Sequence, residues 1–153
     1  MTTAHGQADA VRDVVASVAH HIDAKRWNEL RVLYANEVRT DYTSLFGGAP
    51  QQQAGDALIA GWRGVLERVL TQHLLGPITV ELGASVATGH CHVRALHHLP
   101  GAPSGEHWEV LGHYVFSLQN DASGWKITAM KLETLLQTGN RNLLAEAAAP
   151  ANR

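Results

Sequence analysis

The chain has 153 residues, a formal net charge of -2 and a hydrophobic fraction of 45%, which is the size and composition of one compact globular domain. Lysines and arginines are scattered singly, so no basic stripe can follow a nucleic acid, and no apolar run is long enough to span a membrane. Cys91 is the only cysteine and the first residues lack the apolar core of a signal peptide, so we expect a cytoplasmic protein.

Three helices are predicted in the first half of the chain. Apolar residues recur at helical spacing over residues 9–26, again over the short stretch 27–34, and over residues 56–69, where Asp56 can cap the helix. Asp23 lies beside the apolar face of the first helix, close to its C-terminus. The helix dipole does not favour a negative charge at that end.

In five stretches, side chains alternate between two faces with the period of two that is typical of strands. Residues 51–53 are expected to form a loop. The five stretches cover residues 38–46, 71–82, 86–99, 106–119 and 124–136. The last four are joined by short segments rich in glycine, which favour antiparallel neighbours. Helices followed by an antiparallel meander predict a single α+β domain, with helices on one face of a curved sheet. We expect residues 1–8 and 145–153 to be disordered.

Two histidines stand out because they fall among apolar residues. His73 is followed by Leu74 and Leu75, and His97 lies at the end of the apolar face of the strand over residues 86–99. A buried polar group needs a partner, and Asp23 is the carboxylate with the most similar surroundings. In an apolar cavity an aspartate can fix the imidazole tautomer, so that the histidine acts as a general base. We therefore predict His73 as base, Asp23 as its orienting partner, Tyr42 as hydrogen-bond donor and His97 as a second proton carrier.

Each of these residues also has a purely structural interpretation. His97 could be a satisfied core histidine, since structural networks also perturb titration. Asp23 could bond to Arg26 or Lys25 at the helix end, and Tyr42 could pack in the core with its hydroxyl bonded to the backbone.

Other chemistries find little support in the pattern. His90 and His92 share one strand face, as some metal ligands do, but no clear third ligand accompanies them. Cys91 points to the opposite face and lies in mid-strand, where a reactive thiolate is not favoured. The sequence has no glycine-rich phosphate loop and no nucleophile elbow. We expect neither a metal nor a cofactor.

Five segments together resemble a known family. These are residues 22–27, 40–46, 71–76, 93–98 and 124–127. Their order is similar to that of the SnoaL-like group of the nuclear transport factor 2-like superfamily, and within it to scytalone dehydratase. The resemblance runs from about residue 8 to about residue 144.

The resemblance implies a cone-shaped α+β fold, in which three helices close a strongly curved antiparallel sheet around a deep pocket. It implies an Asp–His pair at Asp23 and His73, a second histidine at His97 and a pocket tyrosine at Tyr42. In the dehydratase such groups remove a proton next to a carbonyl and help the β-hydroxyl to leave as water, without a cofactor. Many members are dimers or trimers, so a homodimer or homotrimer is expected, and the face carrying His107, Glu109 and His113 is a candidate contact surface.

The sequence also departs from the family pattern. Ile22 stands where a second substrate-binding tyrosine is expected, and Gly112 and Tyr114 stand near the position of an expected Ser/Asn pair. These changes leave the substrate and the leaving group open. Residues 137–144 are expected to cover the pocket mouth, as C-terminal segments do in relatives.

The leading hypothesis is therefore a cofactor-independent lyase, dehydratase or isomerase that acts on a small hydrophobic carbonyl compound. An aldol-type polyketide cyclase would need the same base and a substrate of different shape. A non-catalytic small-molecule-binding protein is the alternative from another class, because one fold can serve many functions.

Overall fold

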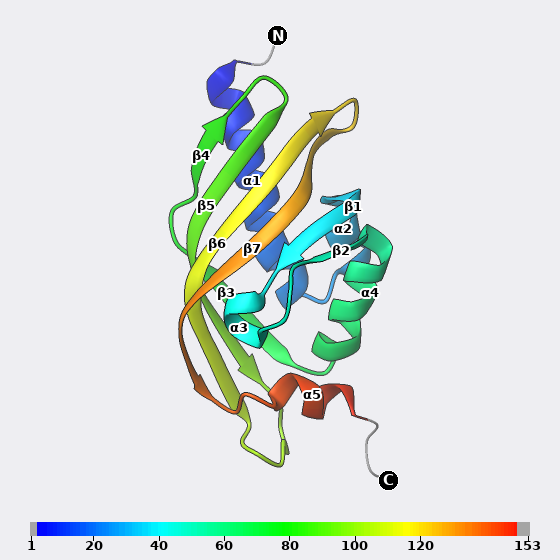
Figure 1. Cartoon of the computed structure of the whole chain (residues 1–153), viewed down its shortest axis with the longest axis vertical. Coiled ribbons are helices and arrows are strands. Elements are labelled where there is room, and N and C mark those ends of the chain that lie inside the picture. Colours follow the sequence, from blue (N-terminus) through cyan, green and yellow to red (C-terminus); the bar gives the residue numbers. More distant parts are fainter. Residues whose placement is uncertain (1–2, 150–153) are drawn as a thin grey trace.

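The structure is a computed structural model that describes residues 3–149. Its helices are α1 (Ala4–Asp23), α2 (Trp27–Val32), α3 (Thr43–Phe46), α4 (Gly55–Leu66) and α5 (Leu143–Ala148). Its strands are β1 (Tyr34–Asp41), β2 (Gln51–Ala54), β3 (Leu70–Leu75), β4 (Thr79–Leu82), β5 (Val86–His98), β6 (His107–Asp121) and β7 (Gly124–Gly139). The long strands β5, β6 and β7 bend along their length, and α1 runs along one side of them (Figure 1).

The seven strands form one mixed sheet. Its order is β2-β1-β7-β6-β5-β3, and β4 also pairs with β5. The predicted α+β class is confirmed, but the sheet is not wholly antiparallel, because β1 runs parallel to β7. No hairpin joins these two strands, so the short turns that predicted antiparallel neighbours carry no information about their direction.

The core lies between the helices and the inner face of the sheet. The apolar face predicted for the first helix is buried, and Val11, Val15 and Ile22 are at most 6% exposed. They meet inward-facing side chains of the sheet such as Phe116 and Ile127, which are at most 1% exposed. In the part of the chain covered by residues 3–149, no helix is long and apolar enough to cross a membrane.

Three predicted strand boundaries were wrong for local reasons. The stretch 38–46 ends as a strand at Asp41, whose carboxylate accepts hydrogen bonds from the Thr43 N–H at 3.0 Å and the Thr43 hydroxyl at 2.7 Å. This is an Asx-type turn, and it leads into α3. Residues 51–53, expected as a loop, belong to β2. The stretch 71–82 is split into β3 and β4 at Gly76 and Pro77, since proline cannot donate to a ladder.

The chain ends are also more ordered than predicted within the described range. Residues 4–8, expected to be disordered, form the start of α1, and residues 145–148 belong to α5. Leu143 and Ala147 are buried, so α5 has an apolar side that the low-complexity tail did not indicate. The disorder predicted for residues 1–2 and 150–153 lies outside the described residues.

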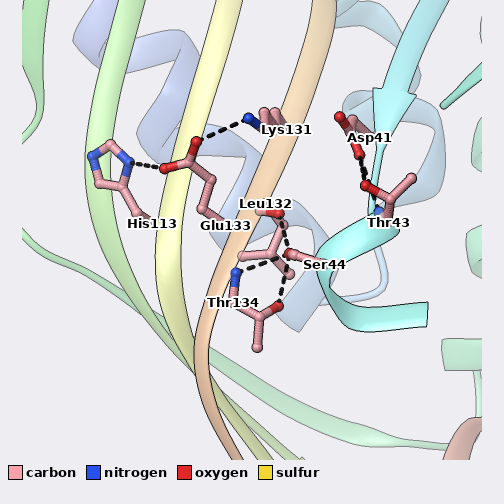
Figure 2. Close-up of polar contacts among 8 residues, drawn as sticks. All are labelled: Asp41, Thr43, Ser44, His113, Lys131, Leu132, Glu133 and Thr134. Carbon is pink, nitrogen blue, oxygen red and sulfur yellow. Dashed lines mark hydrogen bonds and ion pairs between the residues drawn. The ribbon is translucent and has the colours of Figure 1, made fainter. Parts of the chain in front are cut away.

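The outer face of the sheet carries ion pairs within the chain. Glu133 accepts from the Lys131 ammonium at 2.9 Å and lies 3.7 Å from His113 Nδ1 (Figure 2). Arg94 pairs with Glu109 on the neighbouring strands. The homodimer or homotrimer expected through this face stays a prediction.

A bulge bends the sheet between β6 and β7. Leu111 pairs with Leu136 and Gly112 with Thr134, so Leu135 is an extra residue on β7. Bulges of this kind increase the local twist and bend the strand. A Cβ on Gly112 would overlap the Glu133 carbonyl oxygen. The bend therefore requires glycine at this position, where the family resemblance had led us to expect a polar side chain.

We expect Gly112→Ala to destabilise the fold by roughly 2 kcal/mol, because the added methyl group must displace backbone atoms. Gly61 in α4 is the matched control, since a Cβ there meets nothing within 4 Å. Gly61→Ala should stabilise the protein by about 0.5–1 kcal/mol. Urea unfolding measures both changes, and equal stability of the Gly112→Ala variant and the wild type would contradict the assigned role of Gly112.

Candidate active site

Asp23 is the last residue of α1, and its carboxylate joins that helix to β3. Its Oδ2 accepts the His73 backbone N–H at 2.8 Å. Its Oδ1 accepts the Thr71 hydroxyl at 2.9 Å and lies 2.7 Å from His73 Nδ1. The negative end of the helix dipole disfavours a carboxylate at this position. The three hydrogen-bond donors stabilise the negative charge of Asp23 instead.

The hydrogen bonds also set the charge of Asp23. Burial raises the pKa of this carboxyl group, but hydrogen bonds from the side chain and backbone of His73, the charge of that ring, and the Thr71 hydroxyl outweigh burial. The pKa of Asp23 is therefore lowered from its ordinary value, and the side chain is a carboxylate at neutral pH.

The same contact fixes the tautomer of His73. A carboxylate can only accept, so the hydrogen lies on Nδ1, and in the neutral ring Nε2 is left as an acceptor. The His73 side chain is 9% exposed, and the ring lines a largely apolar cavity. The predicted Asp23–His73 pair is thus present in the structure, with a free base position on a ring at the cavity wall.

His97 joins this pair through the register of β3 and β5. Thr71 lies opposite His97 and His73 opposite Ala95, so the two imidazoles share the inner face, with ring centroids 5.8 Å apart. The Nδ1–H of His97 donates to the Trp108 carbonyl oxygen at 3.2 Å. Burial, together with the charge of His73, lowers the pKa of His97 from 6.5 to about 4. At neutral pH the ring is therefore uncharged and carries no proton on Nε2, and its predicted role as a second proton carrier stays a prediction.

The cavity next to these histidines has a volume of about 340 Å³, at the small end of the range for ligand pockets. Among the described residues, no aspartate, glutamate, lysine or arginine lines it. Ile22 lies on its wall in place of the expected tyrosine. The cavity therefore suits an uncharged, largely apolar ligand.

Tyr42 lines the cavity, but a turn positions it and not the predicted strand face. It precedes α3, which Ser44 ties to β7: the Ser44 hydroxyl donates to the Leu132 carbonyl at 2.7 Å and accepts from the Thr134 N–H at 2.9 Å (Figure 2). The Tyr42 hydroxyl lies 3.5 Å from Met130 Sδ. Burial raises the pKa of Tyr42 well above its ordinary value, so the phenol keeps its hydrogen.

The sequence analysis assigned no role to two residues of this site. Tyr114 lines the cavity from β6, and burial, with smaller effects of the Cys91 and Asp23 charges, raises its pKa. It is therefore a second phenol able to donate. Thr71 contacts Asp23 from β3. Strand parity could have found both, because Thr71 shares a face with His73 and Tyr114 lies on the buried face of β6.

The remaining candidates lie elsewhere. His90 and His92 are on the outer face of β5, and within residues 3–149 no group of three or more His, Cys, Asp or Glu side chains is placed to hold a metal ion. Cys91 is buried, and burial raises the pKa of its thiol to about 11, so it is not a thiolate at neutral pH.

The C-terminal segment contributes to the cavity wall through a helix, and the cover of the pocket mouth expected from residues 137–144 stays a prediction. Leu144, Ala145 and Ala148 of α5 line the cavity, whereas the first part of the predicted covering segment is the end of β7. Asn140 links this end to the β5–β6 loop by donating to the Gly105 carbonyl at 2.8 Å.

Comparison with known families gives one match over most of the chain. A family model described as a SnoaL-like domain matches residues 6–131. No curated protein matches the chain.

Several solved structures share the fold. Kfla4162 of Kribbella flavida is 27% identical, with a TM-score of 0.83, over 90% of this chain and 95% of that one. A Novosphingobium aromaticivorans protein to which scytalone dehydratase activity is attributed is 18% identical, with a TM-score of 0.74, over 86% of both chains. A hexachlorocyclohexane dehydrochlorinase of Novosphingobium barchaimii is 13% identical, with a TM-score of 0.71, over 86% of this chain and 88% of that one. At these last two identities the likeness shows the fold alone.

The buried His97 predicts how the stability of the fold depends on pH. Its pKa is about 4 in the folded state and 6.5 ordinarily, so between these values the unfolded chain binds a proton that the folded chain does not. The free energy of unfolding should therefore rise between pH 4 and pH 6.5. The contribution of His97 to this rise is roughly 3 kcal/mol, and it is complete above pH 6.5.

Urea unfolding across this pH range tests the assignment. His97→Asn keeps a donor for the Trp108 carbonyl and should flatten the rise. His92→Gln, on the exposed outer face, should leave it unchanged. A His97→Asn variant with the full wild-type pH dependence would show that another group is responsible.

Proposed function

The chain belongs to the SnoaL-like domain family, and on this basis we propose that it is a cofactor-independent lyase of the dehydratase type. The substrate is a small, neutral, largely apolar carbonyl compound. The observation that carries the proposal is the hydrogen bond of 2.7 Å between Asp23 and His73, made by a ring that lines an apolar cavity without charged side chains.

The reaction begins with proton abstraction. His73 Nε2 takes the proton from the carbon next to the carbonyl, and the C–H electron pair forms an enolate. Asp23 stabilises the imidazolium that results, as a carboxylate does for a catalytic histidine. The enolate then expels the β-hydroxyl group, which receives the proton from His73 and leaves as water. No electron is gained or lost overall, so the sequence of steps needs no cofactor.

Two phenols are available for the charge that develops on the carbonyl oxygen. Tyr42 and Tyr114 line the cavity, and burial keeps both protonated. A hydrogen bond from either one to the enolate oxygen would be stronger in the transition state than in the ground state. His97 is neutral, with Nδ1–H bonded to Trp108, so its Nε2 can accept a hydrogen bond from a substrate hydroxyl group.

The names of the structural neighbours are consistent with this reaction class. Loss of water and loss of hydrogen chloride are both eliminations, in which a base removes a proton and a group leaves the next carbon. A dehydratase assignment and a dehydrochlorinase occur among the neighbours. Another neighbour is described as an aromatic ring hydroxylase, so these names support a class of chemistry and not one substrate.

The rival functions differ in how far the reaction proceeds. An isomerase would return the proton to another carbon, and an aldol-type cyclase would use the same enolate to form a carbon–carbon bond. A non-catalytic binding protein would hold the ligand without proton transfer. A measurement of the first proton transfer separates the enzymes from the binding protein.

Exchange of substrate hydrogen with deuterium from the solvent measures this step without a leaving group. Neutral cyclic ketones, with 1-tetralone and 2-tetralone as first probes, would be incubated with the protein in D₂O and analysed by mass spectrometry. Ligand binding would be followed separately by tryptophan fluorescence, because Trp62 and Trp108 line the cavity. Deuterium uptake above the buffer rate supports the lyase. Tight binding without uptake favours the binding protein.

We expect His73→Ala to lower the rate of proton abstraction by about 10²–10⁴-fold, the usual contribution of a general base. Asp23→Asn should also reduce the rate, because the amide cannot stabilise the imidazolium as a carboxylate does. His90→Ala, on the outer face, is the matched control and should retain the wild-type rate. An unchanged rate in a folded His73→Ala variant would remove His73 from the mechanism.

A further inference from the structure

A chain of hydrogen bonds continues behind the Asp23–His73 pair and ends at Lys25. The Lys25 ammonium donates to Thr71 Oγ1 at 3.2 Å, and Thr71 Oγ1 donates to Asp23 Oδ1 at 2.9 Å. Thr71 is 6% exposed, so water has little access to its hydroxyl group. A charged side chain from outside the cavity wall thus reaches the candidate base through two intermediate groups.

Lys25 occupies a backbone position that usually favours glycine. Helix α1 closes with the Lys25 N–H donating to the Ile22 carbonyl at 3.1 Å and the Arg26 N–H donating to the His21 carbonyl at 2.8 Å, which is the Schellman pattern. Lys25 has a φ of 57° and is the one non-glycine residue with a positive φ within residues 3–149. An outlier of this kind costs free energy, so a functional reason for the side chain is worth testing.

The surroundings of Lys25 hold its ammonium group in place. The group lies 6.0 Å from the ring centroid of Trp27, and the Trp27 indole N–H donates to the Glu67 carboxylate at 2.5 Å. Burial lowers the pKa of Lys25, and the charges of Asp23 and Glu67 oppose that lowering. The Lys25 ammonium is therefore held by the Thr71 hydroxyl and the face of Trp27.

We propose that Lys25 is a positioning residue of the Asp23–His73 pair, which directs the Thr71 hydroxyl hydrogen onto Asp23. This role rests on His73 being the base proposed above. A hydroxyl group has one hydrogen, and an ammonium group can only donate. When Lys25 occupies a lone pair of Thr71 Oγ1, the single hydrogen is free to point to Asp23.

The charge of Lys25 has a second effect. The charged or titratable groups around His73 are Asp23 from α1, Lys25 from the turn after α1, and His97 from β5; Glu67, after α4, acts on Lys25. The Lys25 charge also contributes to lowering the pKa of His97, after burial and His73, so it reaches both imidazoles. Loss of this positive charge should favour protonation of the His73 ring.

Nuclear magnetic resonance titration of the His73 ring in the intact protein, without substrate, tests this role. In Lys25→Met the titration midpoint should move to higher pH by about half a unit or more, the effect expected for one nearby charge at intermediate dielectric. Lys25→Arg keeps the charge and the donor and should keep the wild-type midpoint. Lys126→Met removes a lysine of β7, a strand that does not pair with β3, and should also change nothing.

The threonine gives an independent test. Thr71→Val should move the His73 midpoint in the same direction as Lys25→Met, because Asp23 loses a donor and pairs more strongly with the imidazolium. Thr71→Ser should behave as wild type. This pair carries the test if Lys25→Met does not fold. A wild-type midpoint in folded Lys25→Met, or in Thr71→Val, would overturn the proposal and leave Lys25 as a helix-end contact only. Because no turnover is measured, this failure would be distinct from a failure of the proposed lyase activity.

Discussion

The site depends on a carboxylate placed where a helix does not favour it. Asp23 ends α1, at the negative end of the helix dipole, and is half-buried against β3. It remains ionised because the Thr71 hydroxyl and two N–H groups of His73 donate to it. These bonds fix the distance between helix and sheet and the tautomer of the imidazole. The same hydrogen bonds therefore join α1 to β3 and orient the His73 ring.

The cavity beside this pair has no charged side chain among the described residues of its wall. Within the described part of the chain its lining is apolar apart from histidines, phenols and indoles, none of which carries a permanent charge. Burial keeps His97 neutral and the phenols of Tyr42 and Tyr114 protonated. A neutral ligand in this cavity would contact the imidazole of His73 and the hydrogen-bonding groups of His97, Tyr42 and Tyr114. The low dielectric of the cavity strengthens each hydrogen bond. Leu144, Ala145 and Ala148 of α5 complete the apolar wall.

The sequence predicted the parts of this arrangement that depend on periodicity. The α1 face and the parity of β5 that buries His97 follow from repeating patterns. The pairing of Asp23 with His73 was predicted from their apolar surroundings and from the family resemblance, and the structure contains it. It did not predict features that arise from tertiary contacts, such as the parallel β1–β7 pair and the apolar contacts of α5. The turn at Asp41 and Thr43 was missed because residues 38–46 alternate in the way that is typical of one continuous strand. The sequence indicated Lys25 only as a helix-end partner of Asp23, because its contact with Thr71 forms only when α1 and β3 are adjacent.

The measurement that tests the central claim most directly is the assignment of the His73 ring nitrogens by long-range ¹H–¹⁵N correlation near neutral pH, with and without a bound neutral ketone. The account predicts a hydrogen on Nδ1, a bare Nε2, dependence of this state on Asp23 in the Asp23→Asn variant, and a ligand-induced shift at Nε2. A ring that carries its hydrogen on Nε2, or that ignores both the Asp23→Asn change and every bound ligand, would contradict the assignment of His73 as the base.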